Sequence, residues 1–491
     1  MRALRTPIKK AGSRTALSRI AARLSARIAL ETQSDGSLAA CFDGYSVSLG
    51  KFSAGATKRA RQLRTGMPLG SFSRSSPADQ EIDLLVRRLA RRGLLEYHLA
   101  HAGDDEDQVV IEPQVADYWP QTPALDNNET IVLSRFAYLR RRGSEMVLES
   151  PRAGALFRIR DPEIAAALAK LSAPQKISSL RRQDGFPGAA LLGLLVDCQI
   201  LFRIDAAGGD GLRATEGDDN LVLWDFHDLL FHTRSTQGRQ ANPLGGLYPY
   251  AGMIPPPPAV RPRWPGKKID LRKFSPAPAP SPSPFSKLLH ERHSIRDFDD
   301  AHPITLAELA LFLESTARIQ SKWKAGLDAD GDGPVIEYAS RPYPSGGSAY
   351  ELELYLGVAN CEGLARGFYH YDADRHALVP ISSHAQELEA LLAAGEFAMD
   401  APAAPQVLII ITARFARTLW KYSSVAYSLI LKDVGVLLQT LYMMATDMGL
   451  GGCAIGTNNI DLFARMTGLE FHVEGPVGQF ALGRANGSEP D

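Results

Sequence analysis

A short segment, residues 292–296, combines two arginines with a histidine and a serine. Arg292 and Arg296 stand four positions apart with Ser294 between them, and His293 adds a ring nitrogen. Guanidinium groups offer paired donors and the serine adds a hydroxyl, so the segment could hold one anionic group such as a phosphate. The charge of His293 would make part of that binding depend on pH. The alternative interpretation is a solvated, charged surface turn.

Two glycine-containing segments could bring the backbone close to a flat ring. The first consists of Pro344, Ser345, Gly346 and Gly347. The second, residues 449–456, follows a long apolar stretch and contains Gly451 and Gly452. Adjacent glycines allow close approach and present backbone amides, although ordinary tight turns share this composition. A single cation, Arg484, ends a predicted strand near the end of the chain.

The order and spacing of these segments resemble the nitroreductase-type flavoproteins. Within that family the chain is similar to the SagB-type dehydrogenases, the azoline oxidases of thiazole/oxazole-modified peptide biosynthesis. Lys421 and Tyr422 match the Lys-Tyr pair associated with azoline oxidation, and residues 228–235 resemble the stretch that leads into such domains. The resemblance covers about residues 220–487.

The resemblance implies FMN as the cofactor and assigns its contacts. Arg292, Ser294 and Arg484 would hold the phosphate and ribityl chain, and His293, where the family often has Arg or Thr, could still donate to the phosphate. Arg296 would face the pyrimidine edge of the ring. The remaining contacts, along the isoalloxazine, would come from Pro344, Ser345, Gly346, Gly347, Gly451 and Gly452.

Azoline oxidation removes a proton from Cα and a hydride from Cβ of the ring, so it needs a base beside the flavin. Lys421 is the candidate base. It follows an apolar stretch that includes Leu419 and Trp420, so we expect its side chain to be desolvated. Desolvation would lower the pKa of the lysine toward neutrality and allow it to act as a base. Tyr422 would position or polarise the ring. The alternative makes Lys421 a surface lysine beside a helix and Tyr422 a packing residue.

The resemblance also suggests partners. Family members are interlocked homodimers with two FMN sites at the interface, so Lys421 need not serve the flavin of its own chain. The substrate would be an azoline-containing precursor peptide, and a cyclodehydratase is a further candidate partner. Two other functions remain open: a generic NAD(P)H-dependent nitroreductase or quinone reductase, and a non-catalytic scaffold that recruits a precursor peptide.

The chain is predicted to be α+β, with a nitroreductase-like domain behind two small winged-helix-like domains of the peptide-recognition type. A leader peptide could bind such domains by adding a strand to a sheet edge. The predicted parts are a basic arm at 1–28, winged-helix-like domains at 29–120 and 128–206, a lead-in at 220–254, a proline-rich linker at 255–284 and the oxidase at 285–487. The arm also resembles an organelle presequence.

Local patterns predict the elements that position the site. Thr305 and Glu308 have the spacing of a capping box at the start of a helix over 306–320. Alternating apolar residues predict a strand at 351–358, and a β-branched run predicts a central strand at 407–412. Residues 427–448 are almost all apolar and predict a long helix, the buried spine of the domain.

Bulk properties exclude several classes. The formal net charge of −1 argues against a general affinity for nucleic acid or membrane. DNA binding by the winged helices is an alternative, since four arginines cluster at 87–92, but no stacking aromatics interleave with them. No metal site is expected, because the four cysteines lie far apart and no HExxH motif occurs. The cysteine usage and the lack of an 18-residue apolar run predict a cytoplasmic protein.

Overall fold

A computed structural model describes most of the chain. It covers residues 17–486 apart from residues 27 and 249 and the segments 43–44, 73–75, 102–106, 184–185, 205–215, 217–218, 237–247, 275–280 and 328–332. The chain divides into two compact units, a front unit up to Arg234 and a back unit that comprises nearly all residues from 242 onward. Helices and strands mix in both units, which confirms the predicted α+β class.

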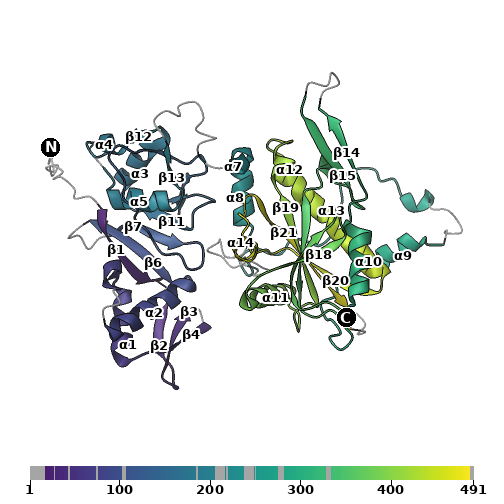
Figure 1. Cartoon of the computed structure of the whole chain (residues 1–491), viewed down its shortest axis with the longest axis horizontal. Coiled ribbons are helices and arrows are strands. Elements are labelled where there is room, and N and C mark those ends of the chain that lie inside the picture. Colours follow the sequence, from purple (N-terminus) through teal and green to yellow (C-terminus); the bar gives the residue numbers. More distant parts are fainter. Residues whose placement is uncertain are drawn as a thin grey trace. The chain divides into compact units, whose positions relative to one another are not determined.

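The front unit is rich in antiparallel strands (Figure 1). Its strands are β1 (Leu17–Leu24), β2 (Ala29–Thr32), β3 (Ser37–Phe42), β4 (Tyr45–Lys51), β5 (Met67–Pro68), β6 (Leu95–His101), β7 (Asp107–Pro113), β8 (Thr130–Leu133), β9 (Tyr138–Arg142), β10 (Glu145–Glu149), β11 (Ala155–Ile159), β12 (Gln175–Lys176) and β13 (Leu201–Ile204). Its helices are α1 (Ala54–Ala60), α2 (Pro77–Arg91), α3 (Pro162–Ala169), α4 (Ile177–Leu180), α5 (Ala189–Asp197), α7 (Asp219–Leu223) and α8 (Phe226–Arg234).

One seven-stranded sheet, ordered β5-β1-β6-β7-β11-β10-β9, runs through both segments that were predicted as winged-helix-like domains. The two segments are joined where β7 pairs with β11. Separate three-stranded sheets, β2-β3-β4 and β12-β8-β13, complete the unit. Strands β3 and β4 form a hairpin, and the residues between them, 43–44, lie outside the described part of the chain.

The front unit differs from the expectations at both ends. Residues from Leu17 onward were predicted as part of a basic arm, but they form β1, which pairs with β6 along its whole length and buries Ala22 and Leu24. Residues 1–16 lie outside the described part. At the other end α8, which the resemblance placed in the lead-in to the oxidase, belongs to the front unit, where Arg234 pairs with the buried Glu149.

Helix α2 shows how local sequence sets an element in this unit. Ser76 caps its first turn by accepting from the Asp79 amide, and Pro77 starts the helix. The arginines at 87–92 make contacts within the chain: the Arg87 guanidinium lies 3.6 Å from the centre of the Trp119 ring, and Arg88 and Arg92 donate to carbonyls of β4. These contacts leave the helix less suited to a nucleic-acid backbone.

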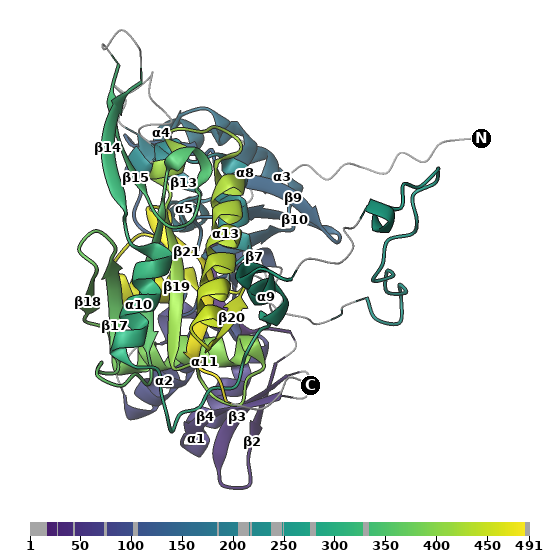
Figure 2. The ribbon, with the colours of Figure 1, turned by 90° about the vertical axis from the view of Figure 1, so that its right-hand side faces the viewer.

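The back unit is built on a six-stranded antiparallel sheet ordered β18-β17-β16-β19-β21-β20 (Figure 2). Its strands are β14 (Ser321–Gly326), β15 (Val335–Ser340), β16 (Leu352–Val358), β17 (Gly367–Asp372), β18 (Ala377–Ile381), β19 (Val407–Arg414), β20 (Leu450–Ile455) and β21 (Glu474–Arg484). Its helices are α9 (Pro284–Glu291), α10 (Leu306–Ala317), α11 (Ala385–Met399), α12 (Ala416–Leu419), α13 (Ala426–Asp447) and α14 (Ile460–Thr467).

Strand β19 lies between β16 and β21 and is buried on both faces, as its β-branched run predicted. Successive side chains of a strand point to opposite faces. Leu408 and Ile410 pack with residues of α11 and α14, whereas Ile411 lies with Val434 of α13 around Gly478. The sheet is therefore covered by α11 and α14 on one face and by α13 on the other. The capping box of Thr305 and Glu308 is present at the start of α10.

Helix α13 was expected to be a buried spine, but only one side of it is buried in the chain. Ile430, Leu437 and Leu441 are buried, whereas Leu431 and Leu438 remain partly exposed. In length and hydropathy α13 would pass as a membrane span, a test that core helices also pass. Residues 255–270 of the proline-rich stretch form neither helix nor strand and are almost entirely exposed, and part of the stretch, 275–280, lies outside the described residues.

Candidate active site

The first candidate cluster forms where the chain leaves α9 and meets the C-terminal half of α13 (Figure 2). The hydroxyls of Ser294 and Tyr442 lie 2.8 Å apart, and the Tyr442 hydroxyl accepts from the Ala454 amide at 2.8 Å. The Arg292 guanidinium lies 5.1 Å from the centre of the Tyr442 ring. The Ile295 amide donates to the Gly452 carbonyl at 2.9 Å. Tyr442 thus organises the segment 292–296 against β20.

Within the described part of the chain, neither Arg292 nor Arg296 forms an ion pair with a carboxylate. His293 is exposed, and its Nδ1 lies 2.8 Å from the Glu291 carbonyl oxygen. Two cations without an internal counter-charge, beside a positioned hydroxyl, suit an anionic ligand. This cluster therefore fits the phosphate end of FMN, which the resemblance implies.

Arg484 was predicted to hold the FMN phosphate and ribityl chain, and in this structure its guanidinium contacts groups of its own chain. Its guanidinium donates to both carboxylate oxygens of Glu308, at 2.8 and 2.7 Å, and to the His302 carbonyl. Its backbone amide donates to Gln406. In this structure Arg484 closes the capping box of α10 against β21, so its charge is already compensated within the chain.

Gly451 and Gly452 are explained by packing inside the chain. A Cβ on Gly451 would lie 2.8 Å from an Ile295 side-chain carbon, and one on Gly452 would collide with the Phe480 ring. Their missing side chains let β20 lie against the segment 292–296 on one face and against β21 and α13 on the other. A contact of their backbone with a flavin stays a prediction.

The second candidate cluster is the loop of Pro344, Ser345, Gly346 and Gly347, which α13 holds through one carboxylate. Asp433 accepts from the Ser345 hydroxyl at 2.8 Å and from the Gly346 amide at 2.9 Å. The Ser345 hydroxyl in turn accepts from the Tyr350 amide at 3.0 Å. The carboxylate therefore holds the loop in place for whatever binds on its outer side.

A second carboxyl lies under the same loop. Glu351 is fully buried, and the Ser345 hydroxyl lies 3.4 Å from one of its oxygens while the other has no partner. Burial raises the pKa of the Glu351 carboxyl to about 7, and the nearby Asp433 carboxylate contributes to the rise. At neutral pH Glu351 is therefore close to half protonated.

Lys421 and Tyr422 meet the loop at Gly347, which has a φ of +60°. The Lys421 ammonium donates to the Gly347 carbonyl at 2.8 Å, and the Tyr422 hydroxyl packs against the Cα of Gly347, where a Cβ would collide with it. Any side chain here would be strained and would displace both residues. The structure thus brings together the predicted catalytic pair and the predicted ring-binding loop.

One expectation about Lys421 is wrong for the single chain. Its side chain was predicted to be desolvated, but it is exposed, since the neighbouring apolar residues turn inward while Lys421 and Trp420 face outward. Leu419 and Phe415 are buried, so the apolar character of the stretch comes from its packing beneath the lysine rather than around it.

The two clusters are not brought together within one chain. Asp433 anchors the loop and Tyr442 anchors the segment 292–296, and these two residues of α13 are nine positions apart. Nine residues correspond to about two and a half helical turns, so the two side chains project from opposite sides of α13.

Sequence reasoning missed Tyr442, Asp433 and Glu351 as members of the site. A signal existed for Asp433, because it is a carboxylate on the buried side of an otherwise apolar helix. Tyr442 carries no comparable signal, since aromatic residues are common in helices. Among the described residues no group of three or more His, Cys, Asp or Glu could hold a metal ion.

Comparisons with known proteins identify the family to which this chain is similar. The nitroreductase family model matches residues 289–484, and the cyanobactin oxidase ThcOx model matches residues 131–241. "Putative nitroreductase MJ1384" of Methanocaldococcus jannaschii is 31% identical over 171 residues, which span 34% of this chain and 76% of that protein. The chain belongs to the nitroreductase family. Members of this family are oxidoreductases that typically use a flavin.

Two further matches are proteins of microcin B17 processing. The microcin B17-processing protein McbC of Escherichia coli is 30% identical over 115 residues, which span 22% of this chain and 42% of McbC. The solved E. coli microcin synthetase McbBCD complex with truncated pro-MccB17 aligns over 57% of this chain and all of the matched one, with 20% identity and a TM-score of 0.38.

Proposed function

We propose that this protein is an FMN-dependent dehydrogenase that oxidises thiazolines or oxazolines in a ribosomally made peptide to thiazoles or oxazoles. The observation that carries the proposal is the meeting of Lys421 and Tyr422 with the loop at Gly347. The sequence matches to the ThcOx model and to McbC support the same reaction class.

The residues described above would hold FMN in part. Arg292 and Ser294 would bind its phosphate, Arg296 would lie toward the ring, and the loop at Gly346 and Gly347 would approach the ring edge, with the Gly346 amide kept by Asp433. When bound, FMN supplies a hydride acceptor for the Cβ hydrogen of the azoline. Arg484, whose Nη2 donates to Glu308, would join the phosphate through the rest of its guanidinium group.

Lys421 would take the Cα proton of the azoline. Its nitrogen is already placed by the Gly347 carbonyl, which accepts one of its hydrogens at 2.8 Å. A lysine acts as a base only when neutral, so the exposed Lys421 must lose solvent when substrate or a second chain covers it. Tyr422, whose hydroxyl rests on the Gly347 Cα, would position the heterocycle by contact or by donating a hydrogen bond.

We further propose that two copies share each flavin site. The segment 292–296 and the loop at Gly347 lie on opposite sides of α13, so one flavin would contact the first cluster of one copy and the second cluster of the other. The partly exposed Leu431 and Leu438 of α13 give the helix an apolar side that a second copy could cover. That cover would also desolvate Lys421.

The front unit would bind the leader of the precursor peptide. In the described residues, β4 pairs only with β3 and β13 pairs only with β8, so each presents an edge to which an extended peptide could add. A cyclodehydratase would be the source of the azoline. The solved relative is itself a synthetase complex with a truncated precursor bound.

The decisive variant is Lys421→Ala. Incubation of the wild-type protein with an azoline-bearing peptide should lower the peptide mass by about 2 Da per ring, the two hydrogens removed. Lys421→Ala should retain its bound flavin and lose at least about a hundredfold in rate, the scale of general-base catalysis. Lys287→Ala, which removes an exposed lysine of α9, is the matched control and should oxidise the peptide normally. Azole formation by Lys421→Ala at the wild-type rate would contradict the proposed role.

A nitroreductase that takes hydride from NAD(P)H is the second candidate, because the putative nitroreductase MJ1384 is 31% identical to this chain over 171 residues. The two candidates differ in what reduces the flavin. Rapid bleaching by NADPH, together with no mass change in the peptide, would favour the nitroreductase. Bleaching by the azoline peptide without a nicotinamide would favour the azoline oxidase.

A further inference from the structure

A cleft of about 500 Å³ opens beside Lys421 and Tyr422. The β14–β15 hairpin forms one wall, and residues that follow β15 and end β19 form the other. Tyr338 of β15 belongs to the cleft and also faces Lys421, whose nitrogen lies 5.7 Å from the centre of its ring. A molecule bound in the cleft would therefore extend directly to the candidate catalytic pair.

The cleft has an excess of positive charge. Its lining contains five cationic side chains and two carboxylates, and a third carboxylate, that of Asp374, pairs with Lys322 from outside the lining, so the cations remain in excess. The cations are Lys322, Lys324, Arg341, Arg414 and Arg417, and the carboxylates are Glu337 and Glu353. Because clefts concentrate the field of the charges that line them, this one should attract anionic groups.

The floor of the cleft holds a buried arginine with unused hydrogen-bonding capacity. The Arg341 side chain is 4% exposed, and its Nε has no hydrogen-bond partner. Among the described residues Arg341 forms an ion pair with Glu353 alone, at 3.4 Å, and Arg414 approaches the same carboxylate from 3.8 Å. A buried donor without an acceptor is costly, so Arg341 is poised to take an anionic oxygen from a ligand.

The hairpin wall suits an extended chain. Trp323 and Tyr338 stack with ring centres 5.6 Å apart, and Trp323 is 43% exposed. In the described residues β14 and β15 pair only with each other, so the hairpin has an edge at which a peptide can add hydrogen bonds. Aromatic surface, a free strand edge and excess cations together describe a site for a peptide that carries carboxylates.

We propose that this cleft binds a carboxylate-bearing segment of the substrate peptide and so presents a neighbouring azoline to Lys421. The proposal rests on the proposed function and adds a substrate preference to it: acidic residues close to the ring would favour oxidation.

The test compares two thiazoline peptides of equal length that carry either glutamate or glutamine beside the ring. Their dissociation constants for the full-length, FMN-loaded protein are measured by fluorescence anisotropy, and KM and kcat by mass spectrometry. The wild type should prefer the glutamate peptide. Arg414→Gln should reduce that preference about fivefold through dissociation constant and KM, the size of one partly exposed charge pair, and Arg414→Glu should reverse it. Arg366→Gln removes an exposed arginine that pairs with Glu389 and does not line the cleft, and it should keep the preference.

Equal affinity of the wild type for the two peptides, or a preference that survives Arg414→Glu, would overturn the proposal. A loss of NADPH affinity in Arg414→Glu with unchanged peptide binding would also overturn it and assign the cleft to a dinucleotide phosphate. If the glutamate peptide binds in an Arg414-dependent way but is never oxidised, the proposed function is contradicted. The proposal that the cleft binds an acidic peptide would then still hold.

Discussion

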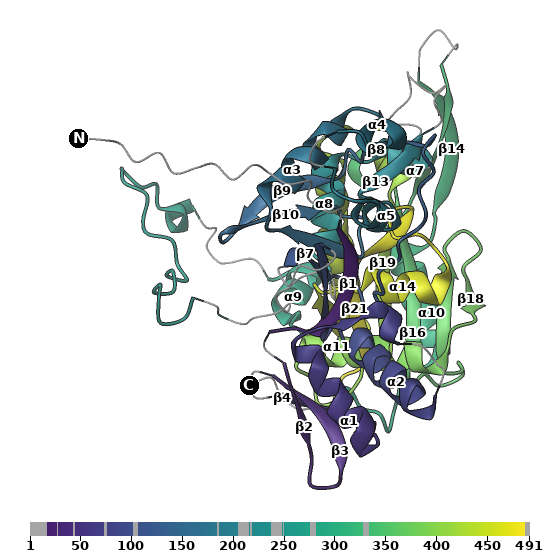
Figure 3. The ribbon, with the colours of Figure 1, turned by 90° about the vertical axis from the view of Figure 1, so that its left-hand side faces the viewer.

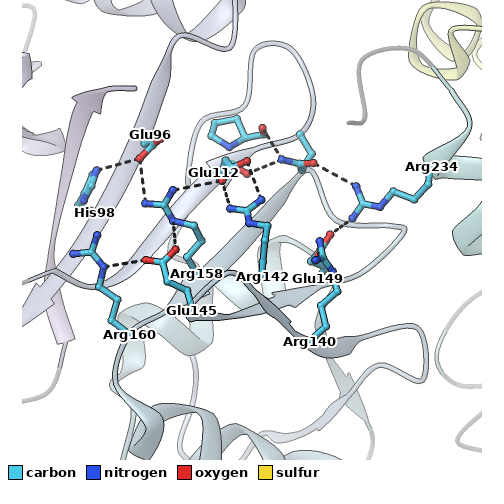
Figure 4. A network of polar contacts seen from close by, with 12 residues as sticks. Glu96, His98, Glu112, Arg140, Arg142, Glu145, Glu149, Arg158, Arg160 and Arg234 are labelled. Atoms are coloured by element: carbon cyan, nitrogen blue, oxygen red, sulfur yellow. Dashed lines mark hydrogen bonds and ion pairs between the residues drawn. The ribbon is translucent and has the colours of Figure 1, made fainter. Parts of the chain in front are cut away.

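Arginines are used in opposite ways in the two units. On one side of the front sheet they alternate with carboxylates in a network that crosses several strands (Figure 4). Arg142 lies 2.6 Å from Glu112, and Arg140 lies 2.5 Å from Glu149. In the back unit, Arg292 and Arg296 have no carboxylate partner within the described part of the chain.

This difference separates charges that hold the fold from charges that are available to a ligand. A carboxylate between two arginines is compensated, and its removal leaves charges without a partner. A cation without a counter-charge contributes nothing comparable to the fold, and it becomes useful when an anion binds. Figure 3 shows β7, β9 and β10, which carry much of the compensated network. The comparison predicts that substitutions in the two regions affect different measurements.

The largest effect is expected for Glu149→Ala. Glu149 is 1% exposed and pairs with both Arg140 and Arg234, so its loss removes the carboxylate that the two arginines share. Because both arginines lose this buried carboxylate, while Arg234 keeps its contacts with Gln114 and Tyr138, we expect the free energy of unfolding of the front unit to fall by about 3 kcal/mol. Urea unfolding gives the magnitude, and faster hydrogen exchange in β10, relative to β19 as an internal reference, assigns the loss to this unit.

Glu145→Ala is the matched control. Glu145 belongs to the same network, but its side chain is 29% exposed, and it contacts Arg158 and Arg160 at 3.4 Å. The free energy of unfolding should fall by less than about 1 kcal/mol, because solvent screens the ion pairs of Glu145. If Glu149→Ala and Glu145→Ala lowered the free energy of unfolding equally, burial of the carboxylate would not control the stability of the network.

The next effect is expected for Arg292→Ala, and it should appear in binding rather than in folding. Loss of one charge-assisted contact to a phosphate should raise the FMN dissociation constant about a hundredfold. The unfolding free energy of the flavin-free protein should change by less than about 1 kcal/mol, because Arg292 has no ion pair to lose. Flavin fluorescence titration and urea unfolding measure the two quantities.

Arg160→Ala, in the front network, should leave FMN affinity unchanged. If Arg292→Ala instead destabilised the flavin-free protein while binding FMN normally, the segment 292–296 would be structural. The distinction between the two regions would then be lost.

The third and smallest effect concerns pH, where the two units should respond with opposite sign. Burial raises the pKa of Glu351 to about 7 from 4.5, so the folded back unit holds the proton that the unfolded chain loses, and its stability falls as pH rises from about 4.5 to 7. Burial lowers the pKa of His98 to about 4 from 6.5, partly opposed by Asp107, so the stability of the front unit falls as pH drops from about 6.5 to 4.

Glu351→Gln should therefore abolish the fall in back-unit stability between about pH 4.5 and 7 and flatten its profile above pH 5. His98→Gln should flatten the profile of the front unit below pH 6.5. Unfolding free energies of each variant across pH 4 to 8, with hydrogen exchange to separate the units, measure both. Profiles parallel to the wild type would mean that these groups titrate in the folded chain as they do in the unfolded one.

Much of the back unit could be predicted because its signals are local. The capping box at Thr305 and Glu308 needs only residues within one helical turn, and β19 is a continuous β-branched run. The front unit was harder to divide. Its segments read as two separate domains, but the pairing of β7 with β11 joins them, and strand pairing between distant segments leaves no local signal.

The residue types and order of the site motifs are determined by the sequence alone. Arg292, Ser294, Lys421 and Tyr422 could be singled out from it, and the resemblance gave them roles. Only the tertiary structure decided which of them meet. It placed Lys421 and Tyr422 on the loop at Gly347, paired Arg484 with Glu308, and left the segment 292–296 on the other side of α13.

The physical reason is the geometry of α13 and the burial of charge. A helix sends side chains nine positions apart to opposite sides, so Asp433 and Tyr442 anchor two separate clusters although both lie in one apolar segment. Whether an arginine is compensated depends on which carboxylate the fold brings beside it. Arg484 is paired with Glu308 within the chain. Arg292 has no carboxylate partner among the described residues, so its charge remains available to a ligand.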